Sequence, residues 1–221
     1  AVVFLVMRGQ LKDMGFEIST AGIHPVVYAF TGVVLWQVWF ETLLKQVDFF
    51  RSGRSFLKSR PVPPQIFFYS QFIVSISDLG IRFILVIIAA TLFGQEFGPL
   101  FWLSPIAGLV LVSSASVLGL VLAVPGSFFS DVVKTLQSIS LGLFIMSPVF
   151  YAVPADPASP LYFFNQFNPF GIFLTNFHAI TFGSDPFMAG PYLIWILVLA
   201  ILLPLFLAYF KLVAPIIIER L

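Results

Sequence analysis

The chain has 221 residues, of which 59% are hydrophobic and only 10% are charged, and its formal net charge is +1. Soluble globular domains carry about 25% charged residues, so a chain with a mean hydropathy of +1.03 has too little polar surface to cover a water-soluble particle of this size. The near-zero net charge provides no global field that would favour nucleic acid or an acidic substrate, and the absence of cysteine excludes disulfides, thiol catalysis and Cys-ligated metal.

The chain opens with a short apolar stretch, residues 1–7, which is followed by Arg8. A spanning helix needs about 20 residues, and a signal peptide would begin with a basic region before its apolar core. We therefore expect residues 1–7 to be the outer end of a first transmembrane helix whose start lies upstream.

Five further apolar segments are each near or above the length that crosses a bilayer core. They cover residues 25–47, 65–93, 100–124, 132–151 and 188–212. An isolated strand would leave backbone groups unpaired in hydrocarbon, so each segment is expected to be a helix. The sequence thus predicts an all-α, polytopic membrane helix bundle, a single transmembrane domain over 1–221 with six spans, the first of them incomplete.

The distribution of basic residues predicts the orientation of the bundle. One short connection and its edges hold five cations, Lys45, Arg51, Arg54, Lys58 and Arg60, and should be cytoplasmic. Threading the chain onward from there places 152–187 outside, and that region contains neither lysine nor arginine. Lys211 and Arg220 follow the last span on the inner side. Both ends of the bundle are then expected in the cytoplasm.

The basic connection 49–60 alternates apolar and cationic side chains. Phe50, Phe56 and Leu57 interleave with Arg51, Arg54 and Lys58. One interpretation is a short surface helix that docks into a cytoplasmic partner. The other is an orientation signal that also contacts anionic lipid headgroups. Composition alone does not separate the two.

The outer region 155–183 is too long for a turn and too aromatic for a solvated loop. Asn168 and Pro169 are typical of an N-cap and a first helical position, and Gly183 of a helix end. The helix between them should present one apolar face, with Phe170, Phe173, Leu174, Phe177 and Ile180, while Thr175, Asn176 and His178 lie largely elsewhere. About 14 residues cannot span a bilayer but can dip into one leaflet and return, and 161–167 is a candidate for a second short leg.

Asp78 and Arg82 are charged residues one helical turn apart inside an apolar span. An isolated charge there costs several kcal/mol on some scales, so the spacing predicts an internal ion pair. The pair either fixes helix packing against a neighbour, which we favour, or faces a substrate path.

Aromatic residues are concentrated in 144–182, beside the outer end of one span. A functional interpretation is a channel or exit lining that guides sugar rings or acyl chains, formed by Phe144, Phe150, Tyr151, Phe170, Phe173 and Phe177. The simpler alternative is lipid-facing and core packing, which accounts for most of the 28 phenylalanines.

No motif for catalysis is present: the sequence has no glycine-rich phosphate loop, no GxSxG and no HExxH. We therefore expect a transport subunit rather than an enzyme, with no nucleotide site and no bound cofactor of its own. A membrane transferase would need a second acid beside Asp78. An ion channel would need a charged ring or a carbonyl filter.

Four stretches together resemble the ABC-2 permeases, and within them the permeases that export O-antigen polysaccharide, polyol phosphate or teichoic acid. They are TGVVLWQVWFETL, FLKSRPVPPQIFFYSQFIVSISDLG, FFSDVVKTLQSISLGLFIMSPVFY and FNPFGIFLTNFHAITFG. The resemblance covers nearly the whole chain, and SPVFY followed by NPFGIFL is its most specific part.

The resemblance implies a homodimer of six-helix subunits in the cytoplasmic membrane of a bacterium, with two cytoplasmic ATPase subunits that bind ATP and Mg²⁺. It implies that Phe49–Arg60 is the coupling helix that contacts the ATPase. It also implies that 147–151 and 168–170 belong to the end of the fifth helix and to external re-entrant helices. The implied cargo is a lipid-linked polysaccharide or related envelope glycan; a lipid, drug or other small hydrophobic cargo is the alternative, because a fold does not decide cargo.

Overall fold

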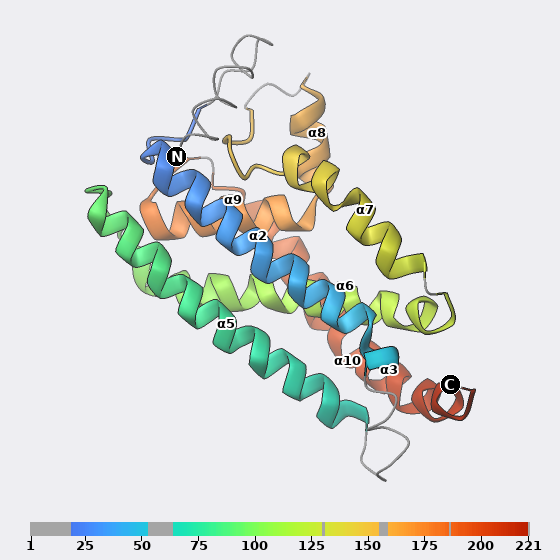
Figure 1. Cartoon of the computed structure of the whole chain (residues 1–221). Coiled ribbons are helices and arrows are strands. Elements are labelled where there is room, and N and C mark those ends of the chain that lie inside the picture. Colours follow the sequence, from blue (N-terminus) through green and yellow to red (C-terminus); the bar gives the residue numbers. More distant parts are fainter. Residues whose placement is uncertain (1–18, 53–63, 130, 155–158, 186, 221) are drawn as a thin grey trace.

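The computed structural model describes residues 19–52, 64–129, 131–154, 159–185 and 187–220. Within these ranges all regular structure is helical and no strand occurs, which confirms the all-α class. The elements are α2 (Pro25–Val47), α3 (Phe49–Ser52), α5 (Pro64–Leu92), η1 (Phe101–Leu103), α6 (Ser104–Phe128), α7 (Asp131–Met146), α8 (Pro160–Phe167), α9 (Pro169–Phe182) and α10 (Ala189–Arg220) (Figure 1).

Four helices in the described ranges are long and apolar enough to cross a membrane. They cover Pro25–Val47, Phe68–Leu92, Phe101–Phe128 and Ala189–Tyr209. This agrees with a multi-pass membrane protein. The count of six spans stays a prediction, because residues 1–7 lie outside the described ranges and α7 is shorter than the sequence suggested.

Helix α7 has 16 residues and ends at Met146, whereas the sequence predicted a span over 132–151. At 1.5 Å per residue it is roughly 24 Å long, shorter than a typical hydrocarbon core. It ends because Ser147 precedes Pro148, and the residue before a proline is biased away from the α conformation. The chain then passes α2, where the Tyr28 hydroxyl lies 3.0 Å from the carbonyl oxygen of Pro148 and 2.9 Å from that of Tyr151.

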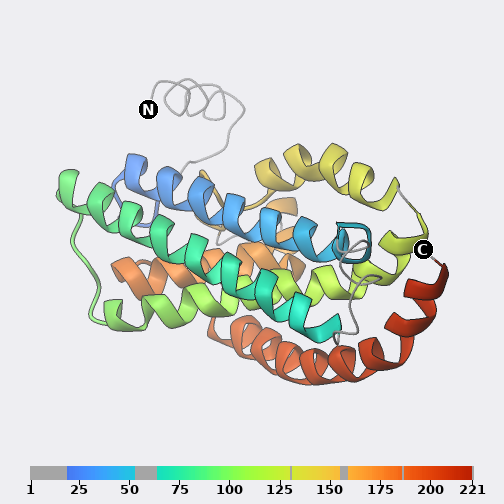
Figure 2. The same cartoon turned by 60° about the horizontal axis from the view of Figure 1, so that its bottom comes forward.

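Helix α6 is the centre of the bundle and contacts α2, α5, α9 and α10. Figure 1 shows α2 in front of it, with α5 on one side and α7 on the other. Figure 2 shows α10 along one edge of the bundle. Leu111 and Ala115 of α6 belong to the same fully buried cluster as Leu35 and Val38 of α2. Van der Waals packing of this kind holds membrane helices together, because lipid tails are as apolar as the side chains they would replace.

Helix α9 begins and ends where the sequence predicted. Asn168 is the N-cap, Pro169 is the first helical residue, and Gly183 ends the helix in the left-handed conformation with φ of 71°. Thr175, Asn176 and His178, which the sequence placed away from the apolar face, are buried as well. Helices α2, α6, α8 and α10 and the turn η1 all contact α9, so it has no solvated face.

Candidate functional site

A network of polar side chains links two of the long apolar helices in the described part of the chain. We call it the Arg82 cluster and define it as Gln37 and Glu41 of α2 with Asp78 and Arg82 of α5. The Arg82 Nε donates to Asp78 Oδ1 at 3.1 Å, which confirms the ion pair predicted from the sequence. Its Nη1 donates to Gln37 Oε1 at 3.1 Å. Its Nη2 donates to the Glu41 carboxylate at 3.2 and 3.3 Å. Arg82 therefore ties α5 to α2.

The Arg82 cluster lies well inside both helices. Glu41 is six residues before the end of α2, and Asp78 is fourteen residues after the start of α5. The relative exposure of the side chain is 47% for Glu41, 28% for Asp78 and 18% for Arg82. A half-exposed carboxylate facing acyl chains costs several kcal/mol. This surface of α2 is therefore suited to water or to another polar surface rather than to lipid.

Glu41 belongs to a stripe of incompletely buried residues that follows α2 with helical spacing. The stripe, which we call the α2 stripe, consists of Phe30, Val33, Gln37, Phe40, Glu41 and Leu44. Gln37 and Glu41 of the stripe lie next to α5, because Arg82 donates to both. The remaining faces of α2 pack on α5, α6 and α9.

Helix α7 beside the stripe has no fully buried residue. Lys134, Thr135, Gln137 and Ser138 are exposed along its first half. Lys134 is paired with Asp131 at 3.9 Å, and both side chains are largely exposed. A helix that shows hydroxyl, amide and charged groups over two turns is not built to face acyl chains alone. The α2 stripe and α7 together are thus the candidate functional surface of the described chain.

The six aromatic residues predicted to line a channel fall into two groups. Phe144, Phe150 and Tyr151 are half-buried near the outer end of α7. Phe170, Phe173 and Phe177 of α9 are at most 1% exposed. In this structure the three α9 rings are core residues that line no opening, because neighbouring helices surround α9. Their assignment to a channel or exit lining stays a prediction.

Trp36 contacts one ring of each aromatic group, Phe144 near the end of α7 and Phe170 of α9. Its ring centroid lies 5.5 Å from that of Phe144 and 5.0 Å from that of Phe170. Phe144 in turn contacts Phe150 at 5.3 Å. Phe173 and Phe177 pack elsewhere, on Tyr192 of α10 and Phe83 of α5 respectively. Ring contacts thus link Phe144, Phe150 and Phe170 through Trp36, while Phe173 and Phe177 belong to the same core cluster through other neighbours.

A polar contact that the sequence did not predict fixes the outer end of α7. The Asn168 side chain makes no capping bond in α9 but donates to Ser147 Oγ at 2.8 Å. Asn165 donates to the Leu161 carbonyl oxygen at 2.8 Å. The Tyr151 hydroxyl donates to the carbonyl oxygen of Met146, and burial raises the pKa of Tyr151 to about 12, so it is a neutral phenol at pH 7. The sequence feature that could have indicated this contact is the pair of asparagines, Asn165 and Asn168, that lie three residues apart just before Pro169.

The basic connection is described only at its start. Phe50 is 1% exposed and packs in a cluster with Phe49, Phe68, Leu120 and Ala123, so it anchors α3 on the bundle. Arg51 is exposed beside it. Burial raises the pKa of Asp48 and the charge of Arg51 partly offsets this rise. The other predicted coupling residues, Arg54, Phe56, Leu57 and Lys58, lie outside the described residues.

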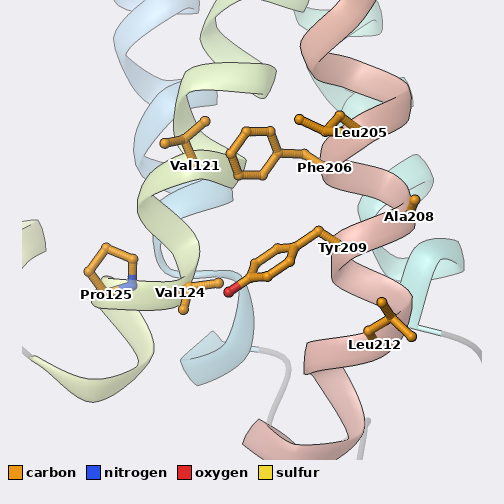
Figure 3. A pocket seen from close by; sticks show the side chains of 8 residues that line it. All are labelled: Val121, Val124, Pro125, Leu205, Phe206, Ala208, Tyr209 and Leu212. Atoms are coloured by element: carbon orange, nitrogen blue, oxygen red, sulfur yellow. The ribbon is translucent and has the colours of Figure 1, made fainter.

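An open groove of about 650 Å³ lies between α6 and α10 (Figure 3). Val121, Val124 and Pro125 form one wall, and Leu205, Phe206 and Tyr209 contribute to the other. The only side-chain polar atom among these six residues is the Tyr209 hydroxyl. The groove offers hydrocarbon contacts and no charged group that could hold a phosphate or a metal.

Among the described residues, no three His, Asp or Glu side chains are grouped so that they could hold a metal ion. No family model matches the chain, and no curated protein matches it in sequence.

Proposed function

We propose that this chain is the channel-forming transmembrane subunit of an ATP-driven ABC exporter that moves a lipid-linked polysaccharide or related envelope glycan across the cytoplasmic membrane of a bacterium. The observation that carries the proposal is the group of exposed polar side chains, Gln37 and Glu41 on the α2 stripe and Lys134, Thr135, Gln137 and Ser138 on α7, all of which lie in apolar segments that the sequence predicts to span the membrane. A single chain forms only one wall of a passage there. A second copy facing the same surface would complete it.

Energy for transport must come from a partner, because the sequence has no phosphate loop. We assign ATP and Mg²⁺ to two cytoplasmic ATPase subunits, each of which contacts residues 49–60 of one copy. Burial of Phe49 and Phe50 against α6 supports this assignment, because it would transmit a push on the connection into the helix that α2, α5, α7, α9 and α10 contact.

The alternative cargo, a lipid or a small hydrophobic molecule, is favoured by one observation, the apolar groove between α6 and α10. None of the residues that line this groove belongs to α2. If the groove carried the cargo, filling it with Ala208→Trp would stop transport, while changes in the α2 stripe would have little effect.

The test of the function is a coupling experiment in cells that contain the full gene and its ATPase. Arg51→Glu with Arg54→Glu should abolish export of surface glycan while the subunit still inserts and still binds the ATPase. Lys211→Glu, which reverses an exposed cation on the last helix, is the matched control and should leave export unchanged. Normal export by the double variant would overturn the coupling assignment.

An independent check concerns orientation. Reporter tags inserted in the basic connection should be cytoplasmic, and tags at 94–99 should be extracytoplasmic. The reverse result would remove any route by which a cytoplasmic ATPase could reach the connection.

A further inference from the structure

The Arg82 cluster has an unequal charge balance. Two carboxylates, those of Glu41 and Asp78, share one guanidinium, which leaves a formal charge of −1. Every guanidinium nitrogen of Arg82 already donates to Asp78, Gln37 or Glu41.

The exposed member of the cluster is negative. The Arg82 side chain is 18% exposed and lies behind its partners, whereas that of Glu41 is 47% exposed on the α2 stripe. A solute that passes along the stripe therefore meets a carboxylate before it meets the cation. The Glu41 carboxylate is therefore the accessible charge of the cluster, and the Arg82 guanidinium is the less accessible one.

Among the described residues, no ion pair joins a further charged group to the Arg82 cluster. Lys45 lies one turn further along α2, is half-buried, and forms no ion pair among the described residues. Its long side chain can extend toward the membrane surface. Asp131 and Lys134 on α7 neutralise each other. A second copy across the passage would double the negative charge at this depth.

We propose that Glu41 makes the passage select against anions, so that the exported polymer is a neutral glycan rather than a polyol phosphate or an acidic polysaccharide. The inference rests on the proposed function and names its substrate class. Between unit charges about 10 Å apart at an effective dielectric constant near 20, repulsion changes local concentration roughly tenfold. Repeated over each charged unit of a polyanion, this would oppose passage strongly.

The absence of cysteine makes a direct test of the potential possible. Leu44→Cys places one thiol on the α2 stripe, one turn from Glu41. Its rates of reaction with a trimethylammonium and a sulfonate methanethiosulfonate are measured in native membranes and normalised to those of a free small thiol. The cationic reagent should be favoured about tenfold. Adding Glu41→Gln should remove most of that preference, and Glu41→Asp should retain it.

Two results would count against the proposal in different ways. Equal normalised rates that Glu41→Gln does not change would overturn the charge selection and leave the passage standing. Failure of both reagents at Leu44→Cys, while Asp185→Cys in an exposed loop reacts, would overturn the passage and with it the proposed function. Ile84→Cys, on an exposed apolar part of α5, is the lipid-facing control and should react with neither reagent.

The cargo itself provides the second test. Glycan recovered from the surface of cells that depend on this exporter should contain no backbone phosphate and no uronic acid. A polyanionic cargo would overturn the selection by Glu41 even if the passage is aqueous.

Discussion

Gly119 of α6 and Gln46 of α2 are packed so closely that a Cβ atom on Gly119 would lie 2.5 Å from the Cβ of Gln46. The same atom would lie 2.8 Å from the carbonyl oxygen of Leu43. The backbone of α2 cannot move away from this contact without disturbing the core around Leu35 and Leu111. Glycine at 119 is therefore a requirement of the central helix pair, in keeping with the small residues found where membrane helices approach each other.

We predict that Gly119→Ala lowers the free energy of unfolding by about 1–3 kcal/mol, the usual cost of inserting a methyl group into a packed core. Gly142→Ala on α7 is the matched control, because no atom lies within 4 Å of its Cβ position. It should be neutral or stabilise by up to about 1 kcal/mol through helix propensity. Thermal unfolding in detergent measures both, and equal effects at the two sites would contradict the close contact.

A second prediction concerns Arg82 as a link between α5 and α2. Arg82→Leu leaves Glu41 and Asp78 without their cation and should lower stability by about 1–3 kcal/mol. Lys134→Ala removes a cation from a largely exposed pair at 3.9 Å and should have no measurable effect. If the two variants unfolded at the same temperature, the Arg82 cluster would have no structural role.

The fold was predictable from the sequence where local chemistry and burial agree. The bounds of α2 follow from Pro25 and the apolar run after it, and those of α9 from Asn168, Pro169 and Gly183. The length of α7 was not predictable from the sequence, because the apolar run continues through Pro148 whereas the helix ends at Met146. All-round burial of α9 depends on contacts with distant helices, which periodicity within one segment does not report.

A third prediction uses the buried His178. Neither ring nitrogen has a hydrogen-bond partner among the described residues, and burial lowers its pKa to about 3. The unfolded chain takes up a proton near the ordinary value of 6.5 and the folded chain does not, so stability falls as pH drops from 6.5 toward 3. The slope should be roughly 1.4 kcal/mol per pH unit.

His178→Leu should remove this component of the pH dependence and be neutral or stabilising at pH 7, because it replaces unpaired buried nitrogens by an apolar group. The measurement is the difference in unfolding free energy between the two proteins from pH 7 to pH 5. A difference that does not change with pH would show that the imidazole is paired or hydrated in the membrane.

A fourth prediction tests the contact between Asn168 and Ser147. Asn168→Ala, Ser147→Ala and the double variant form a cycle in which the coupling should be about 0.5–1.5 kcal/mol. Asn168→Ser keeps a good capping residue but is too short to reach Ser147, so it should behave like Asn168→Ala. If Asn168→Ser were instead as stable as the natural chain, capping would be the role of this residue.

The candidate site was only partly predictable. The spacing of Asp78 and Arg82 was enough to predict their ion pair, because both lie on one helix. Gln37 and Glu41 also lie one turn apart in an apolar span, but nothing local indicates that α5 brings Arg82 against them. The aromatic residues of α9 were assigned to a lining because composition does not distinguish a buried ring from one that faces a passage.

The last prediction separates anchoring from docking at the basic connection. Phe50 is buried against α6, so Phe50→Ala should lower stability by about 3 kcal/mol or more. Phe50→Leu keeps a large apolar side chain at this position and should lose much less stability than Phe50→Ala. Arg51 is exposed, so Arg51→Glu should lower the unfolding temperature far less than Phe50→Ala, even though it removes the cation beside Asp48. Under the proposed function its main effect should be on coupling to the ATPase. The two effects are measured separately, as thermal unfolding of the purified subunit and as ATP hydrolysis and glycan export by the complex. If Arg51→Glu destabilised the subunit as much as Phe50→Ala does, Arg51 would have a structural role. The residues that contact the proposed ATPase would then have to lie elsewhere in the basic connection.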